Sequence, residues 1–234
     1  MWVLGIETSG ELAGLAVADE QGVAAELAFR HRNELSRTLA GRVEAVLALA
    51  GIEVGDLGGI AVTVGPGSFT GLRLGVTFAK SLALARQLPV VGIGALEALA
   101  AERPAHPDAL ICAVMSASDK DLYAALFQWR GGRPEPRAEE MLLPVQDLAQ
   151  RLARAPLHVI LAGQPGPHRA LLCEALGDRL SVLPYDVPPR AATVALLGHM
   201  RIAEGAVSDL HALGPRYLRP SAAEARREAA CQGS

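Results

Sequence analysis

The chain has 234 residues and half of them are hydrophobic, so it can form one large domain or two small ones with a sizeable core. Only 4% of the residues are aromatic, and the core must therefore be filled mainly by Ala, Val and Leu. The formal net charge is −3 with both signs spread along the chain, which excludes a polybasic nucleic-acid-binding surface as the dominant feature.

The sequence shows no sign of secretion or membrane insertion. The opening MWVLGIETSG has no basic region, and Glu7 interrupts its apolar run. No stretch approaches the roughly 18 uncharged apolar residues that a membrane span needs. Cys112, Cys173 and Cys231 are odd in number and widely spaced, which argues against a disulfide framework. We therefore expect a cytoplasmic protein that does not contact a membrane.

The first half of the chain predicts a three-stranded meander followed by helices and further strands. Turn-like residues at Ser9–Gly10 and at 19–22 divide the opening segment into three strand-like runs. Apolar residues at helical spacing predict a helix that stops at Gly51. In chain order we expect strands over 3–31, a helix over 36–50, a strand over 59–64, a helix to about residue 88, an extended piece over 89–94 and a short helix over 96–102.

The second half repeats this order at a spacing of roughly a hundred residues. We expect strands over 109–141, a helix over 145–153, a strand over 157–163, a helix over 168–177, a late helix within 188–205 and an extended segment over 214–219. The two halves share little residue identity. Internal duplication explains the repeated order, and coincidence between two generic α/β stretches remains the alternative.

A meander followed by helices and strands, occurring twice, predicts two similar mixed α/β lobes. This arrangement resembles the actin, sugar-kinase and Hsp70 ATPase superfamily, whose lobes have a ribonuclease-H-like core and enclose a ligand cleft. Residues 1–103 would form the N-terminal lobe and 104–220 a reduced C-terminal lobe, whose late helix can pack back on the first lobe. Residues 221–234 are polar and are expected to form a flexible tail.

The stretch GPGSFTGLR could cradle a phosphate, carry a nucleophile or support another chain. A Walker A loop needs a lysine after its last glycine, but Gly71 is followed by Leu72 and Arg73. The glycine spacing is one residue too long for a dinucleotide fingerprint, and no GxSxG nucleophile elbow is present. We therefore predict a structural glycine loop, whose hydroxyls cap the next helix, with anion binding at the helix start as the weaker alternative. It comprises Gly65, Pro66, Gly67, Ser68, Phe69, Thr70 and Gly71.

The helix after this loop carries more apolar surface than packing on one sheet requires. On a helical wheel its polar residues fall in one narrow arc, and small residues repeat at i, i+4 spacing along another line. Such a helix is either central in a large domain or shared with another subunit, and we predict a shared one. The expected partner or dimer interface consists of Leu72, Gly75, Val76, Ala79 and Ala83, with Leu39 and Val43 from the preceding helix.

Three segments resemble the TsaB (YeaZ) family. GPGSFTGLRLG is similar to the hallmark of that family, VLGIETSG to its opening strand and PRYLRP to its closing segment. The chain departs from the family pattern where Glu7 replaces Asp, where Leu35 precedes Ser36 in place of His, and where Ser116 begins a Ser-Ala-Ser in place of Asp-Ala-Arg.

The resemblance implies a non-catalytic subunit in the formation of N6-threonylcarbamoyladenosine at position 37 of tRNA. Such a subunit would bind and activate a TsaD-like transferase, with a TsaE-like ATPase as third partner. It would pair with itself when the partner is absent, and it would reach tRNA only indirectly.

Two enzymatic alternatives stay open. The first is a TsaD-like metal-dependent transferase or peptidase, although the closest histidines are ten residues apart and cannot form a metal clamp on adjacent helical turns. The second is a small-molecule kinase, although the second-lobe position that would match Glu7 is the uncharged Ser116. We therefore expect no catalytic residue, no metal and no required cofactor. Glu7, Thr8 and Ser116 would form a vestigial cleft that binds nucleotide weakly at most.

Overall fold

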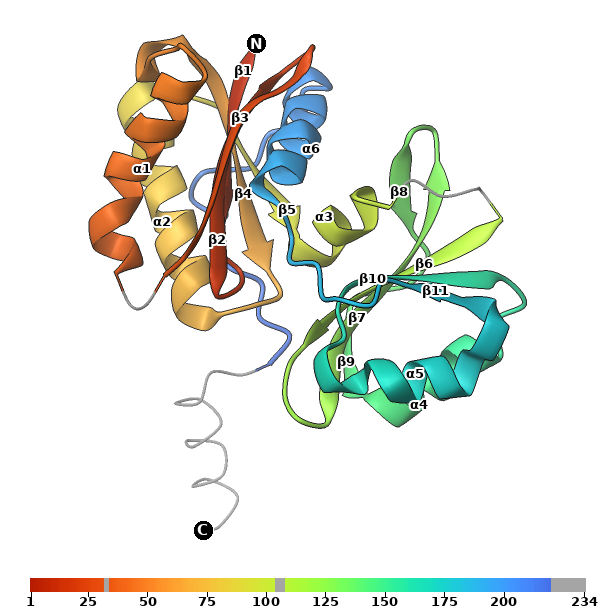
Figure 1. Cartoon of the computed structure of the whole chain (residues 1–234). Coiled ribbons are helices and arrows are strands. Elements are labelled where there is room, and N and C mark those ends of the chain that lie inside the picture. Colours follow the sequence, from red (N-terminus) through yellow and green to blue (C-terminus); the bar gives the residue numbers. More distant parts are fainter. Residues whose placement is uncertain (32–33, 104–107, 220–234) are drawn as a thin grey trace.

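The computed structural model describes residues 1–31, 34–103 and 108–219, which form two α/β lobes (Figure 1). The predicted tail lies outside these residues. In the N-terminal lobe a five-stranded sheet has the order β3-β2-β1-β4-β5. β1–β2 and β2–β3 are antiparallel, whereas β4 runs parallel to both β1 and β5. Its strands are β1 (Trp2–Glu7), β2 (Leu12–Asp19), β3 (Gly22–Arg30), β4 (Leu57–Gly65) and β5 (Val90–Gly94).

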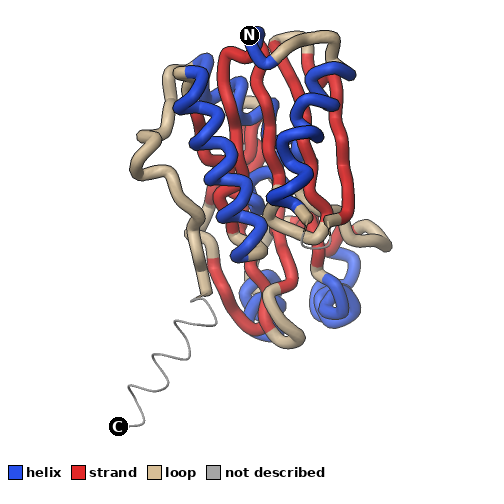
Figure 2. The backbone as a smooth tube through the Cα atoms, turned by 90° about the vertical axis from the view of Figure 1, so that its left-hand side faces the viewer, coloured by secondary structure: helices blue, strands red, loops and turns tan. Residues whose placement is uncertain are grey.

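Helices cover both faces of this sheet. Figure 2 shows α1 (Leu35–Leu49) and α2 (Phe69–Arg86) side by side in front of one face, and α6 (Ala191–Ala203) packs on the opposite face. α6 approaches the sheet very closely, because a Cβ on Gly5 would lie 2.5 Å from the carbonyl oxygen of Ala191. The short 3₁₀ turn η1 (Val54–Asp56) precedes β4.

The C-terminal lobe has a sheet of order β11-β10-β6-β7-β8, with β9 also paired to β7. Its apolar core includes side chains of α4 and α5. The third strand predicted in this half is divided into two short strands, since the chain turns back after β8. The elements are β6 (Ala109–Ser116), β7 (Asp121–Arg130), β8 (Arg133–Pro136), β9 (Met141–Pro144), α4 (Val145–Ala153), β10 (His158–Gln164), η2 (Gly166–His168), α5 (Arg169–Leu176), η3 (Gly177–Arg179) and β11 (Leu180–Val182).

The lobes meet at α3 (Ala95–Ala101), a helix with two apolar sides. Leu96 and Leu99 pack into the core of the second sheet. Ala98 joins Val3 and Val194 in a cluster of the first lobe. α6 and residues 208–219 also lie on the first lobe, although they come last in the described chain. Within the described residues, no helix combines the length and the apolarity needed to cross a membrane.

Candidate functional site

The glycine loop joins β4 to α2 and is held by the protein's own backbone. The N–H of Ser68 donates to the carbonyl oxygen of Ser9 over 2.7 Å, and the Ser68 hydroxyl accepts from the N–H of Gly71 over 3.3 Å. The predicted helix cap is therefore confirmed for Ser68. Two amides that an anion would need already have partners within the chain, which weakens the phosphate alternative.

The glycines are required because two other segments touch the loop. A Cβ on Gly71 would lie 2.1 Å from the carbonyl oxygen of Thr8, which follows β1. A Cβ on Gly65 would lie 2.5 Å from the carbonyl oxygen of Arg216, near the end of the described chain. Gly65 also has a φ of 122°, a conformation that glycine adopts without strain. The loop thus packs against the turn after β1 and against a C-terminal segment.

We call residues 208–219 the C-terminal strap. It begins beside the edge strand β5, where the N–H of Ser208 donates to the carbonyl oxygen of Val90 over 2.9 Å. The Lys80 ammonium of α2 donates to the carbonyl oxygen of Leu213 over 2.9 Å. Further along, the N–H of Arg216 donates to the carbonyl oxygen of Val64 over 2.6 Å.

An aromatic contact completes the attachment of the strap. The ring of Tyr217 stacks on Phe69, the first residue of α2, with 4.7 Å between the ring centroids. Arg73 lies over the same Phe69 ring and donates from Nε to the Tyr217 hydroxyl over 3.0 Å. The polar arc of α2 predicted from the sequence therefore includes two residues, Arg73 and Lys80, that bind the strap.

The predicted interface residues are in the wrong place for contact with another chain. Their side chains pack into the lobe's own core, and a Cβ on Gly75 would lie 2.2 Å from the Thr8 hydroxyl. The apolar excess of α2 is accounted for by the sheet, by α1 and by the strap. All the residues predicted to form the interface are buried within the lobe: Leu72, Gly75, Val76, Ala79, Ala83, Leu39 and Val43.

The opposite side of these two helices is exposed and mixes short side chains with charged ones. A Cβ on Gly41 would meet no atom within 4 Å. Two larger apolar residues, Leu49 and Leu84, are 64% and 70% exposed. We call this surface the outer face; it consists of Ser36, Arg37, Ala40, Gly41, Glu44, Ala45, Ala48 and Leu49 of α1, with Arg73, Thr77, Ser81, Leu84, Ala85 and Arg86 of α2. The outer face could have been predicted from the small residues that lie outside the apolar stripe of α1 in the sequence.

Glu7, the first residue of the expected vestigial cleft, is enclosed within the N-terminal lobe. Glu7 is fully buried, and its carboxylate accepts hydrogen bonds from the N–H and hydroxyl of Ser9 and from the hydroxyl of Thr63. Burial raises the pKa of Glu7 above its ordinary value, although these hydrogen bonds act in the opposite direction. Both carboxylate oxygens are thus engaged within the lobe.

The other two residues expected in the cleft differ from each other in exposure. The Thr8 hydroxyl is buried without a hydrogen-bond partner, whereas Ser116 is exposed at the end of β6 and donates to the carbonyl oxygen of Ser118. Within the described ranges, no group of three or more His, Cys, Asp or Glu side chains could hold a metal ion.

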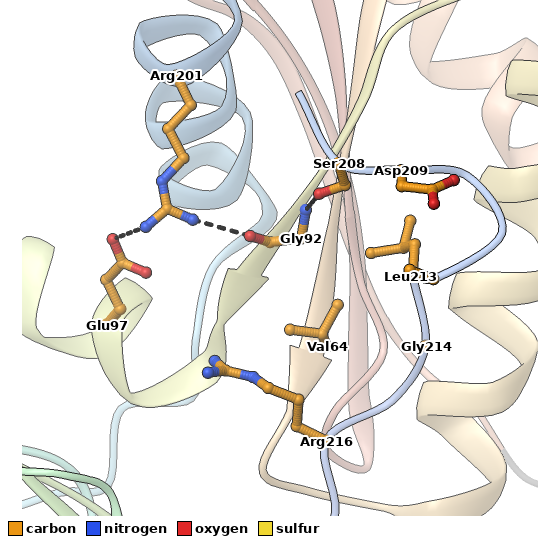
Figure 3. Close-up of a pocket in the computed structure, with 10 residues that line it drawn as sticks. Val64, Gly92, Glu97, Arg201, Ser208, Asp209, Leu213, Gly214 and Arg216 are labelled. Atoms are coloured by element: carbon orange, nitrogen blue, oxygen red, sulfur yellow. Dashed lines mark hydrogen bonds and ion pairs between the residues drawn. The ribbon is translucent and has the colours of Figure 1, made fainter. Parts of the chain in front are cut away.

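A cavity of about 480 Å³ lies between the strap, β5, α3 and α6 (Figure 3). Arg201 of α6 donates to Glu97 over 2.5 Å and to the carbonyl oxygen of Gly92 over 2.8 Å. Arg216 and Asp209 come from the strap, so the lining carries two cations and two carboxylates. The sequence gives no sign of this cavity because its walls come from segments that are far apart along the chain.

Two α/β lobes, each with a meander extended by parallel strands, give the chain the fold of the actin, sugar-kinase and Hsp70 ATPase class of proteins. A hexokinase of the ROK type from Thermus thermophilus shares this fold with a TM-score of 0.56 and 14% identity, over 88% of this chain and all of the other. YeaZ from Pseudomonas aeruginosa has a TM-score of 0.76 and 24% identity, over 93% of this chain and 99% of the other.

Sequence comparison narrows this class to a family. The family model described as "TsaD: tRNA N6-adenosine threonylcarbamoyltransferase" matches residues 15–167. The "tRNA threonylcarbamoyladenosine biosynthesis protein TsaB" of Bacillus subtilis (strain 168) is 31% identical over 229 residues, which cover 97% of each chain. The chain therefore belongs to the TsaB family.

Proposed function

We propose that the chain works in the biosynthesis of threonylcarbamoyladenosine in tRNA, as a non-catalytic subunit that binds and activates a TsaD-like transferase. Membership of the TsaB family supports the pathway, because the Bacillus subtilis relative bears that name. The single observation that carries the role of a binding subunit is the outer face of α1 and α2.

The outer face suits contact with another protein. The small residues Ala40, Gly41 and Ala45 let a second backbone approach closely at that part of the face, which favours helix-to-helix packing. Leu49 and Leu84 also place apolar surface in solvent near the C-terminal ends of the two helices, where a partner could cover it. Figure 2 shows both helices on the same side of the lobe, so one partner can contact both.

The state of Glu7 supports a subunit that performs no chemistry of its own. A carboxylate that binds Mg²⁺ must present free oxygen lone pairs to the ion. Glu7 instead accepts three hydrogen bonds from its own lobe and is 1% exposed. The TsaD-like transferase would thus supply the catalytic groups for transfer to adenosine 37.

Further parts of the proposal concern the assembly. A TsaE-like ATPase would be the third component, and tRNA would be reached through the complex because the chain carries a net charge of −3. The outer face would pair with a second copy when the transferase is absent. The protein would work in the cytoplasm, with no cofactor required.

The outer face can be tested with a matched pair of substitutions. Ala45 on α1 and Ala175 on α5 are both exposed alanines in helices, but they belong to different lobes. Ala45→Arg should weaken binding to a TsaD-like protein about tenfold or more, since an unpaired buried charge costs well over 1.4 kcal/mol. Ala175→Arg should leave binding unchanged. Equal affinities of the two variants, measured by calorimetry, would remove the outer face from the proposal.

A further inference from the structure

The chain crosses between the lobes twice, after α3 and again between β11 and α6. The second crossing, residues 183–190, is anchored to the C-terminal lobe at its start. The N–H of Val187 donates to the carbonyl oxygen of Gly163 over 3.0 Å, and Arg169 donates to that of Pro184 over 2.9 Å. Figure 1 shows this segment running from β11 up to α6.

Two carboxylates hold the other end of this crossing. Glu102, which follows α3, accepts from the N–H of Arg190 over 3.0 Å and from the Thr193 hydroxyl over 3.4 Å. Glu26 of β3 accepts from the N–H of Ala192 over 3.0 Å and from the Arg190 guanidinium. No side chain of the helix itself caps α6 at Arg190. The first turn of α6 therefore depends on acceptors from other elements.

The two carboxylates differ in their surroundings. Glu26 forms an ion pair with the Arg190 guanidinium. Glu102 receives its hydrogen bonds from neutral donors, and the cations that face it, Arg190 and Arg103, interact with it through space. Burial outweighs these favourable interactions and raises the pKa of Glu102 to about 7, against an ordinary value of 4.5.

We propose that Glu102 is a proton-sensitive clamp, which ties α3 to the second crossing and releases the start of α6 when it loses its proton. Loss of the proton leaves a charge in a partly buried place, whereas opening of the crossing exposes that charge fully to water. The clamp is thus tight in acid and loosens as pH rises.

The pH dependence of the opening constant follows from the linkage between opening of the crossing and proton binding by Glu102. When the crossing is open, the Glu102 carboxyl is solvated and titrates near 4.5; when it is closed, the pKa is about 7. Between these values the opening constant should rise up to tenfold per pH unit, or about 300-fold in all, and it should level off above pH 7.

Amide hydrogen exchange on the full chain tests this clamp. The relevant amides are those of Arg190 and Val194, since Arg190 donates to Glu102 and Val194 to the Arg190 carbonyl. After correction for intrinsic exchange rates, their opening constants in the wild type should rise with pH from 5 to 7. Glu102→Gln keeps an acceptor but cannot titrate, so its opening constants should not change with pH. Glu102→Ala should raise them at every pH.

Glu97→Gln is the matched control, because Glu97 also joins α3 to α6 through Arg201. This variant should keep the wild-type pH dependence at Arg190 and Val194. Amides of β6 that exchange only through global unfolding should show the same Glu102-dependent slope at a much smaller opening constant, because unfolding also exposes Glu102 to water. The clamp is refuted if Glu102→Gln retains the wild-type slope, or if the wild type has none. The glutamine variant decides the matter even if Glu102→Ala does not fold.

Discussion

Replacing Gly71 with alanine tests whether the glycine loop is determined by contacts within the chain. Gly71 lies in the first turn of α2, and an added Cβ would be 2.1 Å from the carbonyl oxygen of Thr8. This oxygen belongs to the backbone immediately after β1, so the clash cannot be relieved by a side-chain rotation. Either the start of α2 or the turn after β1 must move.

The expected cost combines two opposing effects. Overpacking a tight site costs about 1–3 kcal/mol, and a contact with backbone belongs at the upper end. Alanine recovers at most about 1 kcal/mol through its better helix propensity. The net loss is therefore about 2 kcal/mol. For a chain of this size, it should lower Tm by about 4–8 °C.

Gly41 provides the matched control for this prediction. It is also a glycine within a helix, but a Cβ there would meet no atom within 4 Å. Gly41→Ala should therefore stabilise the protein by about 0.5–1 kcal/mol through helix propensity alone. Thermal unfolding of the two variants by circular dichroism compares the predictions. Shifts of the same sign in both would refute the close approach between Gly71 and Thr8.

Three further predictions concern stability. Tyr217→Ala removes the stacking on Phe69, so Tm should fall by about 2–4 °C; an unchanged Tm would mean that the strap is not attached in solution. Lys80→Met should raise amide exchange in the strap around Leu213 by about fivefold or more, since the Lys80 hydrogen bonds to the carbonyl oxygens of Leu213 and His211 are lost and together contribute at least about 1 kcal/mol; unchanged exchange would contradict the tether. The folded-state pKa of Glu7 is raised, so its contribution to stability is greatest in acid and declines as pH rises above about 4.5. Glu7→Gln should therefore have a flatter Tm profile above that pH than the wild type, and identical profiles would contradict this assignment.

The order of elements was predictable because each helix and strand has a local pattern. Helices expected over 36–50 and 96–102 occur at Leu35–Leu49 and Ala95–Ala101. The meander is bounded by turn residues in the sequence, and it forms β1 to β3. The β8–β9 division was not predicted, because it depends on a return of the chain to pair with β7.

The face that α2 presents was predicted wrongly for a physical reason. Small residues let any backbone approach closely, and the pattern cannot tell the protein's own turn from a partner. Gly75 and Ala79 are small because the Thr8 turn and the sheet lie against them. Gly75→Leu is accordingly expected to disrupt folding, because the added side chain would collide with Thr8.

The strap and the contact between Glu102 and Arg190 were not predicted, because both depend on residues far apart in the sequence. The strap meets the end of β4 through Arg216 and Val64, which are about 150 residues apart in the chain. The periodicity of apolar residues reports helices and strands, and it does not predict contacts between such distant positions. The same is true of Glu102 and Arg190, whose contact depends on how α3 and α6 pack.

Reconstitution of the tRNA modification tests the central claim most directly. The assay would combine a TsaD-like transferase, a TsaE-like ATPase and tRNA, and it would measure threonylcarbamoyladenosine with and without this chain. We predict that product formation requires the chain, that Ala45→Arg abolishes most of its effect, and that Ala175→Arg does not. Full activity in the absence of the chain, or full activity with Ala45→Arg under conditions that limit binding, would contradict the account.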